Sequence, residues 1–113
     1  MKYHEEKIGA IQVVRIQEAR LDHTVSSELK TELLRLVEAE GEPNLLIDLY
    51  EVDYADSSGL GALLFGHRQA KAHSGVLKLV NTNPKVDTLI KIAKLEDILE
   101  TFADEQAALD SFA

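Results

Sequence analysis

The chain has 113 residues, of which 45% are hydrophobic and 28% charged, and its formal net charge is −8. This length and composition are typical of one small globular domain. A surface this acidic repels phosphate backbones and anionic bilayers, which disfavours direct binding of DNA, RNA or acidic lipid. Because the chain has no cysteine, it has no disulfides, thiolate metal sites or cysteine nucleophiles.

The N-terminal segment 1–6 lacks the apolar core of a signal peptide. The longest apolar stretches reach only a handful of residues, far below the roughly 20 that span a bilayer. We therefore expect a cytoplasmic protein that keeps its N-terminus and does not insert into a membrane.

The first part of the chain is rich in β-branched residues and predicts two strands of one sheet, paired antiparallel. The main strand covers Ile8–Gln17. A shorter strand near Tyr3 precedes it, and the two are joined through Gly9.

From Val25 onward, apolar residues recur every three or four positions while charged residues fill the other side, which predicts an amphipathic helix. Thr24 or Asp22 is its candidate cap, and Gly41–Asn44 ends it. The next segment, Leu45–Leu49, is a nearly continuous apolar run of strand length. It predicts a central strand that is buried on both faces.

A polar loop through Asp53 and Asp56 leads into a second predicted helix, Ser57–Ser74, which is closed by Gly75. The apolar segment Val76–Val80 predicts the next strand.

Asn83 followed by Pro84 is typical of a helix N-cap with proline in the first turn, so a third helix is expected there. Ile98–Phe102 predicts a last edge strand, and Asp104–Phe112 predicts a last short helix. The alternation predicts an α/β fold with a mixed, mostly parallel sheet of about five strands and about four helices. The pattern leaves open whether the helices cover one face of the sheet or both.

The segment Asp53–Gly61 lies between a buried strand and a helix start, where open α/β sheets meet their ligands and partners. A helix N-terminus has free N–H groups and the positive end of the dipole, so Ser57 or Ser58 would tolerate a phosphate there. A phosphate would place about −1.5 to −2 charges beside Asp56 and alter any partner surface over this loop. Aspartate and serine are also ordinary N-caps, and that plainer interpretation stays open.

Catalytic and metal sites are disfavoured. The chain has no G-x-S-x-G elbow around a serine, and the glycines after Ser58 lack the third glycine and the lysine of phosphate-binding loops. The four histidines show no i, i+4 pairing, so no metal ligand set is predicted. Asp22 and His23 are adjacent and rarely face each other, which makes Asp22 a turn or capping residue rather than a catalytic one. We expect no cofactor and no enzyme activity.

Three glycines inside the second helix are unfavourable, since each costs about 1 kcal/mol relative to alanine. Close packing of the helix against the sheet explains Gly59 and Gly66. It does not explain Gly61, which lies with Phe65 on roughly the opposite side. We interpret Gly61 and Phe65 as part of a partner-binding or self-association patch.

Several segments together resemble the STAS domain family, and in particular the single-domain anti-sigma factor antagonists of bacteria. The resemblance runs from about Tyr3 to Leu109, and its most specific element is Asp-Ser-Ser-Gly-Leu-Gly after a buried strand. It implies a single STAS domain over 1–113. The segments are Leu21-Asp22-His23, Leu45–Asp48, Asp56–Leu64 and Leu95–Ala108.

The resemblance implies a partner that is both an anti-sigma factor and a serine kinase of the GHKL ATP-binding type. Binding of the antagonist frees the sigma factor, phosphorylation of Ser57 releases the antagonist, and a phosphatase resets it. Ser58 is the alternative acceptor. Asp56 matches the acid of the family motif, and Asp22 matches the acidic residue near the kinase-binding surface. The implied partner-binding residues are Asp22, Asp56, Ser57, Ser58, Gly59, Gly61 and Phe65.

The chain departs from the family pattern at Ala19-Arg20, at Ala93-Lys94 and at Phe65, where a small residue is common. Two other hypotheses remain. One is a STAS subunit without a switch, in a stressosome-like assembly or as the cytoplasmic component of a transporter. The other is a small enzyme or nucleotide binder. Weak association into a homodimer also stays open.

Overall fold

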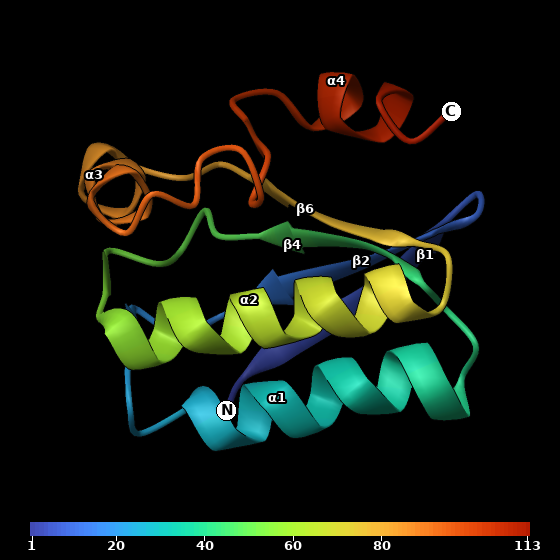
Figure 1. The fold of residues 1–113 in the computed structure, drawn as a ribbon, viewed down its shortest axis with the longest axis horizontal. Coiled ribbons are helices and arrows are strands. Elements are labelled where there is room, and N and C mark those ends of the chain that lie inside the picture. Colours follow the sequence, from blue (N-terminus) through green and yellow to red (C-terminus); the bar gives the residue numbers. More distant parts are fainter.

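The computed structural model describes residues 1–113, and its main sheet has five strands in the order β1-β2-β4-β6-β7 (Figure 1). β1 pairs antiparallel with β2, and the remaining pairs are parallel. The predicted mixed, mostly parallel sheet is confirmed, with β4 at its centre. The strands are β1 (Tyr3–Ile8), β2 (Ile11–Ile16), β4 (Asn44–Asp48), β6 (Val76–Val80) and β7 (Thr101–Phe102).

A separate pair of two-residue strands, β3 (Arg20–Leu21) and β5 (Tyr54–Ala55), lies beyond the carboxyl ends of the main strands. The pair is parallel and joins the loop after β2 to the loop after β4. The sequence did not predict it, because two residues carry no periodicity.

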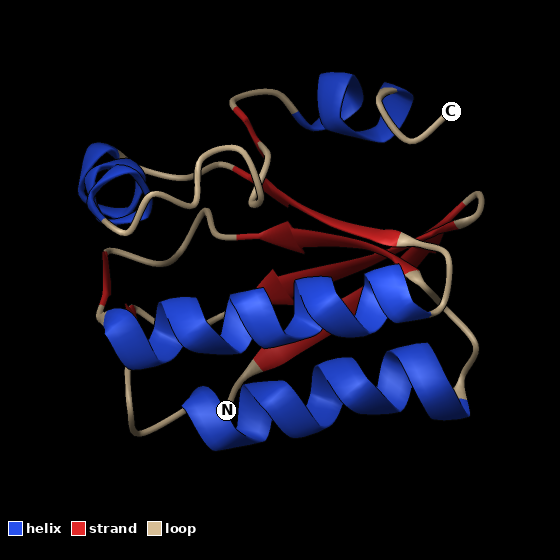
Figure 2. Ribbon diagram, viewed as in Figure 1, coloured by secondary structure: helices blue, strands red, loops and turns tan.

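The helices cover both faces of the sheet, which settles the alternative that the sequence left open (Figures 1 and 2). α1 and α2 lie side by side on one face, α4 lies on the other, and α3 lies near the carboxyl ends of the strands. None of the helices is both long and apolar enough to cross a bilayer. The bounds are α1 (Ser26–Leu34), continued by the π-helical turn η1 (Arg35–Ala39), α2 (Ser57–Ala72), α3 (Pro84–Ile92) and α4 (Glu105–Asp110).

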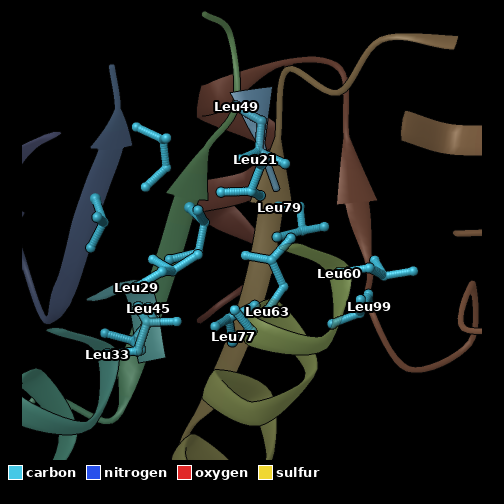
Figure 3. Close-up of a cluster of buried hydrophobic side chains, with 14 of the residues drawn as sticks. Leu21, Leu29, Leu33, Leu45, Leu49, Leu60, Leu63, Leu77, Leu79 and Leu99 are labelled. Atoms are coloured by element: carbon cyan, nitrogen blue, oxygen red, sulfur yellow. The ribbon is translucent and has the colours of Figure 1, made fainter. Parts of the chain in front are cut away.

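The main core has 21 buried residues, most of them between the sheet and the α1–α2 layer. Figure 3 shows leucines from the strands and from both helices pointing toward one another. On the opposite face, Ala108 of α4 closes a smaller cluster with four strand residues. Lys78 is buried there, and its ammonium group donates to the carbonyl and the hydroxyl of Ser111 at 3.0 and 2.8 Å, which ties the C-terminal segment to the sheet.

Several local predictions are confirmed. The side chain of Asn83 accepts a hydrogen bond from the Val86 N–H at 2.9 Å, and Pro84 begins α3. Gly41 has φ of +65°, as expected for a glycine that follows a helix. These signals work because each depends on neighbouring residues alone.

Two predictions near the N-terminus are wrong. Ile8 ends β1 rather than beginning β2, because Gly9, with φ of +61°, forms the turn between the strands. The N-cap of α1 is Val25, without a side-chain bond, rather than Thr24 or Asp22. A turn that begins at Asp22 leads into the helix, so the Asp22 carbonyl already accepts the first backbone N–H groups.

Two predictions in the second half also need correction. α2 ends two residues earlier than predicted, and Ser74 rather than Gly75 has the positive φ that closes it. The expected edge strand Ile98–Phe102 shortens to β7, because the N–H groups of residues 98 and 99 donate to the Leu95 carbonyl in a local turn.

Gly59 and Gly61 differ in the space that a side chain would find around them. A Cβ on Gly59 would lie 1.9 Å from the backbone oxygen of Leu21, whereas a Cβ on Gly61 would meet nothing within 4 Å. We predict that Gly59→Ala destabilises the domain by about 1–3 kcal/mol through overpacking. Gly61→Ala, the matched control, should stabilise it by about 0.5–1 kcal/mol through helix propensity. Urea unfolding measures both, and equal effects would contradict the packing difference.

Candidate functional site

Ser57 is the first residue of α2 and is exposed at the carboxyl edge of the sheet. Asp56 is the N-cap, with an extended backbone, and its Oδ1 accepts a hydrogen bond from the Gly59 N–H at 3.0 Å. The backbone N–H groups of Ser57 and Ser58 donate to no group of the chain. The Ser57 hydroxyl therefore lies at the positive end of the helix dipole, in reach of a partner.

The loop between β3 and α1 flanks this helix start. The Asp56 N–H donates to the Leu21 carbonyl at 3.2 Å, and Gly59 packs directly on the same carbonyl. His23 follows in the loop, with its Nδ1 3.8 Å from Oδ2 of Asp56. The structure thus brings together the residues around 22 and 56 that the sequence placed in two separate loops.

Asp22 is buried in this loop and holds its turn. Its Oδ1 accepts hydrogen bonds from the hydroxyl and the N–H of Thr24, and its Oδ2 accepts one from Arg20 Nε at 3.2 Å. The Thr24 hydroxyl, more than the other donors, holds the pKa of the Asp22 carboxyl below its ordinary value. The predicted turn role of Asp22 is confirmed, and its contact with a partner stays a prediction.

A surface groove of about 730 Å³ runs from the start of α2 to α3. Ser57 and Asp56 form one side of it, and Ile92 on α3, which is 72% exposed, lies on the other. Tyr54 is 39% exposed and contributes an aromatic ring. The full lining is Tyr54, Ala55, Asp56, Ser57, Pro84, Lys85, Thr88, Leu89 and Ile92.

This groove was not predicted from the sequence. The one signal in the sequence was Ile92, an apolar residue of α3 that the structure leaves exposed. The depth of the groove depends on how far α3 stands from α2, which no local pattern determines.

Gly61 and Phe65 lie four and eight residues after Ser57 on α2, so the three residues share one face of the helix. Gly61 opens to solvent, and Phe65 is half-buried about 12 Å along the helix axis from Ser57. Gly59, in contrast, is buried against β3 and cannot touch a partner through a side chain. Its contribution to the site is to bring the helix start close to the loop after β3.

The histidines form no metal centre, and no group of three or more His, Cys, Asp or Glu side chains could hold a metal ion. His67 is half-buried along α2, and its Nδ1 is enclosed without a hydrogen-bond partner. Burial lowers the pKa of His67, so it is a packed residue of the helix rather than a surface cation.

The model of the STAS domain family matches residues 3–108. The chain belongs to the STAS domain family. The match confirms the resemblance drawn from the motif segments, and it includes both the turn at Asp22 and the start of α2 at Ser57.

Two curated relatives are anti-sigma factor antagonists. The STAS domain described here is 24% identical over 109 residues to the anti-sigma F factor antagonist of Paenibacillus polymyxa, covering 96% of this chain and 89% of that protein. It is 34% identical over 71 residues to the anti-sigma-B factor antagonist of Bacillus subtilis, covering 63% of this chain and 65% of that protein.

The fold is shared with a solved antagonist in two states. The unphosphorylated form of the anti-sigma factor antagonist SpoIIAA superposes with a TM-score of 0.82 at 22% identity, over 97% of this chain and 95% of that one. The phosphorylated form of SpoIIAA from Bacillus superposes with a TM-score of 0.76 at 20% identity, over 99% of this chain and 100% of that one.

The cap at Asp56 leads to a prediction for this STAS domain. Asp56→Ala should lower the free energy of unfolding by about 1 kcal/mol, because the Gly59 N–H loses its acceptor. Asp56→Asn keeps a capping oxygen and should remain within a few tenths of a kcal/mol of the parent. Chemical denaturation measures both, and an equal loss in the two variants would show that the charge, rather than the cap, stabilises the helix.

Proposed function

We propose that this STAS domain is an anti-sigma factor antagonist, switched by phosphorylation of Ser57. The unphosphorylated domain binds an anti-sigma factor that is also a serine kinase of the GHKL type, and so frees a sigma factor. Phosphorylation releases the domain, and a phosphatase resets it. The observation that carries the proposal is the exposed Ser57 hydroxyl at the start of α2, on the wall of an open groove.

The chemistry belongs to the partner. The Ser57 oxygen forms a bond to the γ-phosphorus of ATP while the bond from that phosphorus to the β-γ bridging oxygen breaks. ADP leaves, and a base of the kinase takes the hydroxyl proton. The domain is therefore a substrate and has no catalysis of its own. This agrees with its relatives, which are named as antagonists. We also propose a cytoplasmic location for the domain.

The geometry explains why a phosphate would alter binding without unfolding the domain. At the first position of α2, the free N–H groups and the helix dipole stabilise the added negative charge. In a complex, the same group adds about −1.5 to −2 charges beside Asp56 in a surface that had fitted a neutral hydroxyl. Repulsion and loss of hydration then favour release.

The groove and the open helix surface supply the contact area. Ile92 and Tyr54 are exposed apolar side chains within the groove that also contains Ser57. A kinase that reaches the Ser57 hydroxyl must cover these side chains as well. Gly61 lets the backbone of a partner approach α2 one turn further along, which explains a glycine that nothing inside the chain requires.

We predict that Ser57→Ala binds its GHKL-type kinase and is not released when ATP is added, because it lacks the acceptor oxygen. Ser57→Asp should bind at least about tenfold more weakly, since an unpaired charge in an interface costs about 2 kcal/mol or more. Each GHKL-type serine kinase of the source organism, purified, serves as the partner in a calorimetric titration.

Two further variants serve as controls. Ser27→Asp adds the same charge at an exposed serine in the first turn of α1 and should bind like the parent. Ile92→Lys keeps Ser57 but places a charge in the groove and should weaken binding. Stable binding that neither Ser57→Asp nor ATP changes would instead support the alternative, a STAS subunit of a larger assembly.

A further inference from the structure

Arg20 carries a guanidinium group whose binding capacity is largely unused. The group stacks on the Tyr54 ring, 4.4 Å from its centroid, and its Nε donates to Asp22 at 3.2 Å. Its two terminal nitrogens donate to no group of the chain, and 65% of the side chain is exposed. Two parallel N–H donors on a planar fork match the oxygens of a phosphate.

His23 is a second polar side chain at the same edge, next to Asp56. Its side chain is 77% exposed, and its Nδ1 lies 3.8 Å from Oδ2 of Asp56, the residue directly before Ser57. The ring has no hydrogen bond that fixes its orientation. Its ring nitrogens can donate hydrogen bonds to phosphate oxygens.

The pairing of β3 with β5 places both groups at the same edge of the sheet as the start of α2. Arg20 pairs with Tyr54 in this register, and Tyr54 and Ser57 line the same groove. The Asp56 N–H donates a hydrogen bond to the carbonyl of Leu21, which lies next to Arg20 in β3. β3 and the loop after it, which carry Arg20 and His23, therefore flank the start of α2.

We propose that Arg20 and His23 form an intramolecular receiving site for a phosphate on Ser57. The Arg20 terminal nitrogens bind two phosphate oxygens, and a protonated His23 lies between the phosphate and the Asp56 carboxylate. This proposal rests on the proposed function, because it names the residues that regulate the phosphorylated state of the same site. It implies that the released domain keeps its phosphate paired with its own side chains.

Other charged groups around Ser57 also act on a phosphate at this position. Asp22 and Asp56 on the two loops oppose the phosphate, and Asp53 adds a third negative charge before β5. Lys85, at the start of α3, is the cation of the groove lining itself, which includes neither Arg20 nor His23, and it has no ion pair within the chain. His23 contacts Asp56, which favours binding of the phosphate on the side of the loop after β3. Lys85 contacts neither Asp56 nor Ser57 through a hydrogen bond or ion pair.

The test uses the full chain with phosphoserine incorporated at position 57 during translation, so that no kinase is needed. A ³¹P NMR titration measures the second pKa of the phosphate, which is ordinarily about 6. Neighbouring cations favour the dianion, so this pKa should lie below its ordinary value. Arg20→Gln and His23→Asn should each raise it by a few tenths of a unit, and the double variant by up to about one unit, a tenfold change in proton affinity.

Three controls make the result specific. His73→Asn removes an exposed histidine at the far end of α2 and should leave the phosphate pKa unchanged. Arg20→Lys keeps the charge without the fork and should restore part of the shift. The unphosphorylated variants should remain folded in a thermal unfolding scan, because both side chains are largely solvent-exposed and Thr24 still donates to the Asp22 carboxylate.

The proposal is overturned if the double variant titrates like the parent, or if Lys85→Gln alone raises the phosphate pKa. Either result counts only against Arg20 and His23, since the phosphate was incorporated directly. Failure of the kinases to bind or modify the chain would count against the switch instead.

Discussion

The contact between the first turn of α2 and the backbone of β3 determines the geometry of the functional edge. Gly59 has no side chain, and the Leu21 carbonyl occupies the space where a Cβ would lie. The same carbonyl accepts the Asp56 N–H, so one backbone oxygen fixes both the cap and the packing of the helix start. As a result, the exposed Ser57 stands beside the loop that carries Asp22 and His23.

Electrostatics then connect this geometry to the proposed switch. The chain is strongly acidic, and three aspartates lie in the loops around Ser57, so an added phosphate increases a negative field that is already present. The helix dipole, Arg20 and His23 offset that charge within the domain, but a partner that had fitted the neutral serine has no such compensation. The fold can therefore tolerate the same phosphate that disfavours the complex with the partner.

The sequence predicted the sheet, its main helices, the Asn83 cap and the motif at Asp56, since these depend on periodicity and on near neighbours. The sequence also distinguished Gly59, which packing explains, from Gly61, which packing does not explain. It could not predict the β3–β5 pair or the groove beside Ile92, because both depend on how distant segments meet. The stacking of Arg20 on Tyr54 follows from that pair, so the sequence showed Arg20 only as a departure from the family pattern.

The central claim is that the chain is the substrate of a partner kinase at one serine. Intact-mass measurement and peptide mapping, after incubation with ATP and each GHKL-type serine kinase of the source organism, test it directly. We expect a single added phosphate on Ser57 that is lost in Ser57→Ala. Absence of phosphate from both Ser57 and Ser58, with kinases that are active on their own substrates, would rule out the proposed switch.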